Sequence, residues 1–166
     1  METSAILTEL PRLRRYARAM LGNRAAADDL VQDTLERAWS RFAQWRAGGE
    51  LRPWLFGIMH NLRVDQLRRP GLNTLPMEDE DFEVPIRATQ TDRLELSDLE
   101  SALVLLPEEQ RAVLLLVGLE EMSYDEVAST LGIPIGTVMS RLSRGRERLR
   151  LILQGRPPAV SLRVVR

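Results

Sequence analysis

The sequence of 166 residues predicts an all-α fold of two small helical domains, and two observations support this prediction. Apolar residues recur at helical spacing through most of the chain, whereas the alternation typical of strands persists nowhere. A stretch rich in proline, glycine and acidic residues interrupts this pattern near the middle. We therefore expect a first domain at residues 1–70, a flexible acidic linker at 71–92, a second domain at 93–154 and a flexible tail at 155–166.

Seven helices are expected. In the first domain they span residues 6–21, 24–43 and 53–69, and in the second domain 91–105, 107–118, 124–131 and 134–153. Ser123, followed three residues later by Glu126, forms a capping-box pattern, and Gly132 stands where a helix ends in the left-handed conformation. A short helix, a tight turn and a longer helix follow one another here, which is typical of a helix-turn-helix.

The composition argues against several classes of site. The chain has no cysteine and only one histidine, His60, so no metal site is expected. No apolar run approaches the roughly 20 residues that span a bilayer, and the N-terminus lacks a basic start, so we expect a cytoplasmic protein. Because no glycine-rich phosphate loop or cysteine nucleophile is present, neither catalysis nor a cofactor is expected.

Charge is distributed unevenly along a chain whose net charge is only -1. Residues 1–70 hold 12 arginines and 8 acids, whereas residues 71–92 hold 1 arginine and 6 acids. From residue 93 to 136 there are 2 arginines and 9 acids, but from residue 137 onward there are 8 arginines against Glu147 alone. The last helix is therefore the basic surface of the chain.

The expected last helix has two different faces. Its apolar stripe consists of Val138, Leu142, Gly145, Leu149 and Ile152. A second stripe, roughly perpendicular to the first, consists of Thr137, Ser140, Arg141, Arg144 and Arg148. A recognition helix needs this division, because guanidinium groups can bind phosphate oxygens or pair with guanine in the major groove. The alternative is a basic helix that is merely solvated, and the preceding capping box and Gly132 turn favour DNA binding over it.

A stretch of the second domain resembles region 4 of extracytoplasmic-function sigma factors. The resemblance rests on Leu106-Pro107-Glu108-Glu109-Gln110-Arg111, on Ser123-Tyr124-Asp125-Glu126-Val127-Ala128, and on residues 131–142. It implies that the last helix reads the minus 35 promoter element. The positions that match the family's DNA-facing motif are Gly136, Thr137, Ser140, Arg141 and Arg144. Met139 departs from it, since the family usually has Lys or Arg there, and this puts one phosphate contact in doubt.

Residues 28–39 resemble region 2.2 of the same family, which docks on the polymerase core. Asp29, Gln32 and Asp33 match the positions implied to make that contact. By periodicity alone this segment is an ordinary surface helix with an apolar and a polar face.

Residues 52–58 and 61–69 resemble region 2.3 and its continuation, which melt and read the minus 10 element. Single strands are held by cationic grooves and by pockets for flipped bases, and the candidates here are Asn61, Arg63, Arg68 and Arg69. Trp54 and Phe56 are expected in the hydrophobic core rather than as stacking platforms.

Together these resemblances imply a sigma factor that binds RNA polymerase core and promoter DNA, under the control of an anti-sigma factor. The acidic linker could imitate RNA charge or serve as a solvated tether. Two alternatives are a stand-alone regulator that binds an operator as a dimer, and a sigma mimic that titrates an anti-sigma factor. The region 2.2 motif disfavours the first, and retention of Thr137, Arg141 and Arg144 argues against the second.

Overall fold

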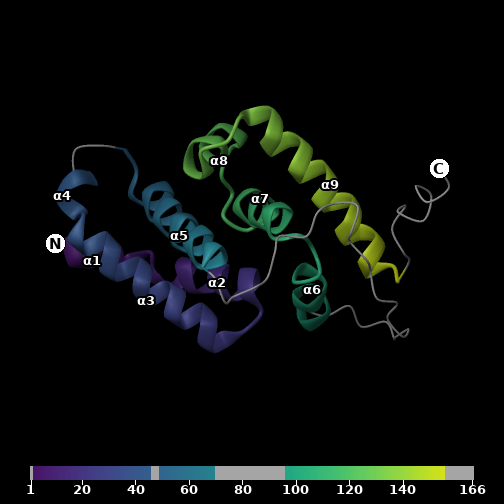
Figure 1. The fold of residues 1–166 in the computed structure, drawn as a ribbon, viewed down its shortest axis with the longest axis horizontal. Helices are drawn as coiled ribbons and strands as arrows, with labels where there is room; N and C mark the ends of the chain where they lie inside the picture. The colour runs from purple at the N-terminus through teal and green to yellow at the C-terminus, as the bar shows by residue number, and fades with distance from the viewer. Residues whose placement is uncertain (1, 46–48, 70–95, 156–166) are drawn as a thin grey trace.

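The computed structural model describes residues 2–45, 49–69 and 96–155, and every regular element in these ranges is a helix. The predicted all-α class is therefore confirmed (Figure 1). The predicted linker at 71–92 lies outside the described residues, as does the predicted tail apart from Gly155.

The first half of the chain forms α1 (Glu2–Thr8), α2 (Leu10–Leu21), α3 (Arg24–Ser40), α4 (Phe42–Trp45) and α5 (Leu51–Arg68). The prediction of one helix at residues 6–21 is wrong, because the chain breaks at Glu9 between α1 and α2. Pro11 is the physical reason: it lies in the first turn of α2, and it cannot donate the hydrogen bond that would continue α1.

The predicted helix at residues 24–43 is shorter than expected. It ends at Ser40, and Arg41 separates it from the single turn of α4. Phe42 of α4 is buried and its ring lies 5.1 Å from that of Trp45 and 6.4 Å from that of Trp54. This break lets the chain turn a small aromatic cluster back onto the start of α5.

The second half forms α6 (Leu96–Leu103), α7 (Glu108–Gly118), α8 (Tyr124–Leu131) and α9 (Ile135–Leu153). The capping box is confirmed, since the Ser123 hydroxyl accepts from the Glu126 N–H and the Glu126 carboxylate accepts from the Ser123 N–H. Gly132 ends α8 with a φ of 71°, as predicted. Pro107 and Pro134 stand one position before the helices they were expected to begin.

In the first half, α2, α3 and α5 pack around a common apolar centre. Leu13, Leu30 and Leu55 are fully or almost fully buried there, and the ring of Tyr16 meets that of Phe56 edge-on at 5.0 Å. This three-helix arrangement fixes which faces of α3 and α5 remain outside.

In the second half, α9 packs against α6, α7 and α8. The crossing with α7 is close at Gly145, where an added Cβ would lie 3.2 Å from Leu114 Cδ1 and 3.3 Å from Gln110 Cβ. A glycine at this position therefore lets the two helix axes approach each other.

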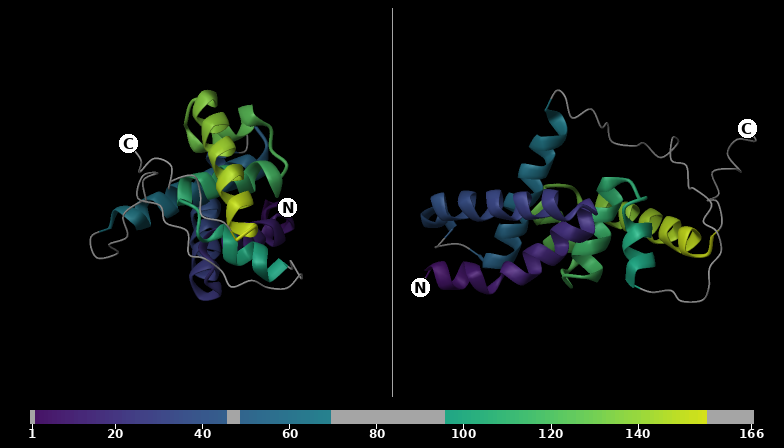
Figure 2. Two further views of the ribbon diagram at one scale, coloured as in Figure 1. Left: turned by 90° about the vertical axis from the view of Figure 1, so that its right-hand side faces the viewer. Right: turned by 90° about the horizontal axis from the view of Figure 1, so that it is seen from below.

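The two halves also pack against each other, with α5 on α8 and α2 on α6 and α7. Their buried apolar side chains form one cluster that runs from Ile6 in α1 to Ile152 in α9. Figure 2 shows these helices from two further sides. Two domains that were expected from the sequence thus meet along a shared hydrophobic interface.

Candidate nucleic-acid interface

The residues predicted to contact the minus 35 element lie on α9, most of them in its first three turns. Gly136, Ser140 and Arg144 are exposed, whereas Thr137 and Arg141 are half-buried. The left-handed turn at Gly132 and the extended backbone of Pro134 set the direction in which α9 leaves α8. The free N–H groups of this helix start add a partial positive charge, which favours a phosphate near Gly136.

Arg141 has an acidic partner within the protein: its guanidinium lies 3.7 Å from the Glu109 carboxylate of α7. The Arg141 side chain is about a quarter exposed and that of Glu109 is largely exposed. An exposed ion pair of this length is weak, so it leaves the guanidinium exchangeable with another anion.

Arg148 does not lie with the other predicted contacts. It is only 8% exposed, on a helix that packs against α6, α7 and α8. The periodicity of the sequence placed Arg148 beside Arg141 and Arg144, but periodicity does not reveal a second packing partner. Met139, at 48% exposure, lies open on the surface.

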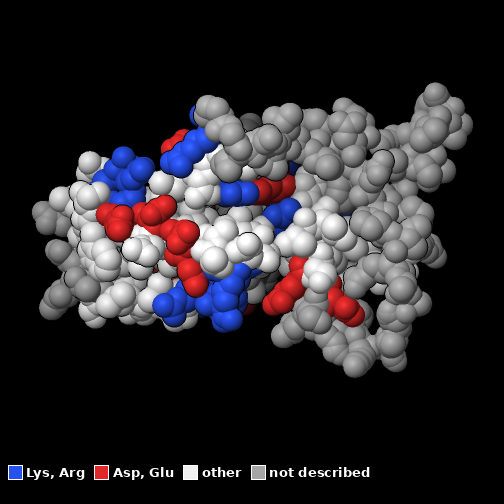
Figure 3. All heavy atoms as spheres, turned by 60° about the horizontal axis from the view of Figure 1, so that its bottom comes forward, with Lys and Arg blue, Asp and Glu red and all other residues white. Residues whose placement is uncertain are grey.

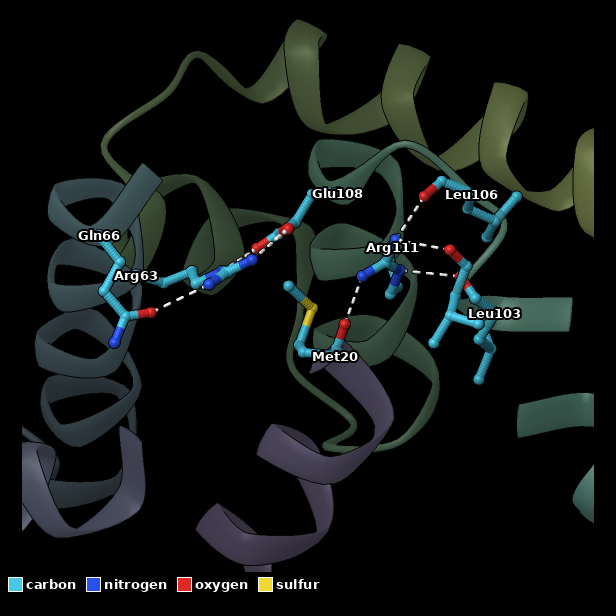
Figure 4. A network of polar contacts seen from close by, with 8 residues as sticks. Met20, Arg63, Gln66, Leu103, Leu106, Glu108 and Arg111 are labelled. Atoms are coloured by element: carbon cyan, nitrogen blue, oxygen red, sulfur yellow. Dashed lines mark hydrogen bonds and ion pairs between the residues drawn. The ribbon is translucent and has the colours of Figure 1, made fainter. Parts of the chain in front are cut away.

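The predicted minus 10 residues lie on α5 and just after it. Asn61, Arg68 and Arg69 are exposed. Arg63 instead points to the second half of the protein, where its Nε and Nη2 donate to the Glu108 carboxylate at 2.5 and 3.0 Å (Figure 4). Arg63 also donates to Gln66 at 3.0 Å, so its guanidinium is held from two sides.

The aromatic residues of α5 contribute mainly to packing. Phe56 is almost fully buried, which confirms its expected place in the hydrophobic core. Trp54 is half-buried, with its ring 6.0 Å from that of Trp45. His60 is also half-buried, and burial lowers its pKa; Arg141 lowers it further, while Glu108 and Glu109 act in the opposite direction.

The predicted polymerase-binding residues lie together on α3. Asp29, Gln32 and Asp33 are exposed, whereas Leu30 and Val31 on the same helix are buried in the hydrophobic core. On the face where α3 comes forward, acidic side chains form a band beside arginines (Figure 3). Trp39, further along this helix, is 41% exposed.

A buried polar network that the sequence analysis did not predict joins the two halves. The Glu120 side chain is 0% exposed and pairs with Arg12 at 3.1 Å and Arg15 at 3.3 Å, both from α2. No sequence pattern links these residues, because more than 100 positions separate them.

Arg111 is the second unpredicted part of this network. Its guanidinium donates to the carbonyl oxygens of Leu103 at 2.8 Å, Val104 at 3.1 Å and Leu106 at 2.6 Å, and also to that of Met20 in α2 (Figure 4). Burial lowers the pKa of Arg111, and the nearby Glu108 opposes that shift. One buried side chain thereby ties the end of α2 to the loop before α7.

Nothing in the described ranges adds a metal or membrane site. Across residues 2–45, 49–69 and 96–155, no three His, Asp or Glu side chains gather as metal ligands would. Within the same ranges, no helix combines the length and the apolar character needed to cross a bilayer.

Two family models match the chain, one in each half. Residues 6–60 match the Sigma2 domain of PhyR, and residues 96–149 match Sigma-70, region 4. The two matches occur in the order expected from the sequence, with the predicted linker between them. The first contains α2, α3 and α4 and most of α5, and the second contains α6, α7 and α8 and most of α9.

Relatives and solved structures agree with these matches. The ECF RNA polymerase sigma factor EcfG of Rhodopseudomonas palustris is 38% identical over 153 residues, which cover 89% of this chain and 82% of the relative. The sigma factor RpoE from Bartonella quintana, solved in complex with the anti-sigma factor NepR, has a TM-score of 0.75 at 34% identity and covers 92% of this chain and 96% of its own. CnrH, solved in complex with the cytosolic domain of CnrY, has a TM-score of 0.67 at 26% identity and covers 92% of this chain and 87% of its own. The chain therefore belongs to the ECF, or extracytoplasmic-function, family of RNA polymerase sigma factors, which are transcription initiation subunits rather than catalysts.

Proposed function

We propose that this sigma factor binds the RNA polymerase core enzyme through α3 and directs it to promoters by contacting a minus 35 element with α9 and a minus 10 element with α5. The observation that carries the proposal is the exposure of three separate polar faces on helices that match sigma regions in order. Catalysis is then the task of the polymerase, and the protein acts in the cytoplasm without a cofactor.

The minus 35 contact is assigned to the start of α9. Gly136 lets the DNA backbone approach, Thr137 and Ser140 offer hydroxyl groups, and Arg141 and Arg144 offer guanidinium groups to phosphates or guanine. Arg148 takes part only if the side chains that bury it rearrange, since it is 8% exposed in the present arrangement.

The minus 10 contact is assigned to the outer face of α5. Asn61 can pair with an unstacked base, and Arg68 and Arg69 supply positive charge at the end of the helix. Arg63 joins them once its pairing with Glu108 is released.

The polymerase contact is assigned to Asp29, Gln32 and Asp33. These side chains are exposed on one face of a well-packed helix, so they can meet a complementary surface without rearranging the first half. Trp39, further along α3, adds apolar area to the same helix.

Regulation by an anti-sigma factor follows from the relatives. RpoE was solved with the anti-sigma factor NepR and CnrH with the cytosolic domain of CnrY, and both share the fold of this chain. We therefore expect a protein partner that holds the two halves together when the inducing signal is absent. The mimic alternative predicts binding to this partner without any promoter binding.

Paired substitutions test the DNA assignment. Arg141→Ala and Arg144→Ala should each weaken binding of the polymerase holoenzyme to its promoter by about 5-fold to 150-fold if a base pair is read, measured by fluorescence anisotropy at fixed salt. Arg150→Ala is the matched control, because it removes the same charge from the last turn of α9, where Arg150 pairs with Glu147. If all three variants lost the same amount of promoter affinity, the effect would be due to net charge alone, and the assignment would be contradicted.

The polymerase assignment needs a separate measurement. Asp33→Asn should reduce the affinity of the free chain for core polymerase about tenfold, because one charge of a specific contact is lost, whereas Asp125→Asn on α8 should leave it unchanged. Competition with a labelled wild-type chain gives this ratio directly. Unaltered competition by Asp33→Asn would remove α3 from the interface.

A further inference from the structure

Met139, near the start of α9, is the most exposed of the large apolar side chains in the described ranges, at 48%. The residues about one turn before and after it on the helix surface are Gly136 and Ser143, which are both exposed and both small. A Cβ added at Gly136 would meet no atom within 4 Å. The Met139 side chain therefore stands out above the two residues that flank it, with its thioether in water.

This side chain borders the face of α9 that is assigned to DNA. At about 3.6 residues per turn, Gly136, Ser140 and Ser143 form one exposed row along the helix. Arg144 follows on one side of this row and Met139 on the other. Because the row itself carries no long side chain, base edges can approach the helix closely between these two flanks. Met139 is therefore within reach of a base when α9 lies in the major groove.

An open surface groove between α8 and α9 contains Met139 and combines apolar with basic side chains. Tyr124, the first residue of α8, and Arg146 of α9 line this groove with it. The carboxylate of the groove, Glu147, is already paired with Arg150 at 2.6 Å. In the part of the chain that the structure describes, no acidic side chain pairs with the exposed Arg146. Its guanidinium is therefore available to a phosphate, which places a DNA backbone along the groove.

The chemistry of the thioether selects what it can contact in the major groove. Base edges there present hydrogen-bond donors and acceptors, and one apolar feature, the C5-methyl group of thymine. A methionine side chain donates no hydrogen bond and accepts only weakly, so contact with a polar edge would leave that edge without a partner. Contact with a methyl group carries no such cost and removes apolar surface of both groups from water. Thymine is therefore the base that Met139 fits.

We propose that Met139 reads the methyl group of one thymine in the minus 35 element, while Arg146 binds a phosphate of the backbone beside it. The inference rests on the proposed function of α9. It adds a base preference to the hydroxyl and guanidinium contacts already assigned to this helix, and it names the group on the DNA that carries the preference. A promoter of this protein is therefore expected to hold a T·A pair where Met139 meets the duplex.

The direct test removes the methyl group and nothing else. The promoter recovered most often from a randomised library serves as a labelled parent duplex, and each thymine of its minus 35 element, on either strand, is replaced singly by deoxyuridine. The holoenzyme of core polymerase and the full chain should bind one of these duplexes about fourfold more weakly than the parent. Met139→Ala should bind the parent at least about fourfold more weakly than wild type, and should bind the parent and that deoxyuridine duplex equally.

Matched variants separate the methyl contact from other effects. Leu7→Ala removes a side chain of similar exposure, 45%, from α1 and should keep the fourfold ratio between thymine and deoxyuridine. Met139→Leu keeps an apolar side chain and should keep at least about half of that ratio. In a salt series, Arg146→Ala should lower the slope of log affinity against log salt by about 0.9, the value for one phosphate contact, whereas Met139→Ala should leave the slope unchanged.

The proposal is overturned if the recovered element holds no thymine, if every deoxyuridine duplex binds as well as the parent, or if the preference for thymine persists in Met139→Ala. A loss of affinity for core polymerase in Met139→Ala, with promoter binding by the assembled holoenzyme unchanged, would overturn it in favour of a protein contact in the groove. An unchanged salt slope in Arg146→Ala would remove the phosphate contact.

Failure of the proposed function has a different signature. In that case Arg141→Ala and Arg144→Ala also leave promoter binding by the holoenzyme unchanged. If the present inference alone fails, those two variants still lose promoter affinity, while thymine and deoxyuridine are bound equally by the wild-type chain.

Discussion

Replacing Arg111 tests whether one buried side chain holds the two halves together. Arg111→Met keeps most of the aliphatic volume but removes the hydrogen bonds that Arg111 donates to the carbonyls of Leu103, Val104, Leu106 and Met20; of these, the Leu103 carbonyl still accepts from the Leu106 N–H. A buried carbonyl left without a donor costs about 1 to 3 kcal/mol, and part of this loss is recovered because a charge no longer needs to be buried. We expect a net loss of about 3 kcal/mol in the free energy of unfolding.

Urea denaturation followed by circular dichroism measures this loss. With a slope of about 2 kcal/mol per molar urea, the midpoint should fall by about 1.5 M. Arg111→Lys is the matched control, because it keeps the positive charge but replaces the planar guanidinium by a compact ammonium group. The ammonium group cannot reach all four carbonyl oxygens, so an intermediate urea midpoint is expected. A shift below about 0.3 M for Arg111→Met would refute the view that this network stabilises the fold.

Three further changes test separate parts of the account. Ser123→Ala should lower the free energy of unfolding by about 1 kcal/mol in a urea titration, because the capping box of α8 is lost; no change would mean that the cap contributes nothing. Gly145→Val should cost about 1 to 3 kcal/mol by overpacking against Leu114 and Gln110, and a stabilised variant would contradict the close crossing of α7 and α9. Burial lowers the pKa of His60 in the folded chain, so as the pH falls the unfolded chain protonates this histidine first, and stability should fall below about pH 6.5. His60→Gln should flatten this pH dependence in melting experiments. An unchanged profile would assign the dependence to other groups.

Local structure was largely predictable from the sequence because its determinants are close in the chain. The start of α8 follows from Ser123 and Glu126, three residues apart, and its end follows from Gly132, whose N–H bonds to the Ala128 carbonyl four residues earlier. The break at Glu9 could also have been found, since Pro11 stood in the sequence, but the apolar period running through it favoured a single helix.

The interface between the halves was not predictable in this way. Arg63 and Glu108 are 45 residues apart, and Arg111 and Met20 are 91 apart, so no periodicity connects them. The burial of Arg148 was hidden for a similar reason, because α9 packs against three helices from other parts of the chain. The residues assigned to DNA could be named from the sequence, but not which of them face acidic partners within the protein.

The most direct test of the central claim is transcription in vitro from a randomised promoter library, with purified bacterial core polymerase and with or without this protein, followed by sequencing of the transcripts. The account predicts transcripts that depend on the protein and share two spaced elements. Binding to the core polymerase without specific transcripts would contradict the sigma factor assignment in favour of a mimic, and absence of polymerase binding would contradict it in favour of a stand-alone regulator.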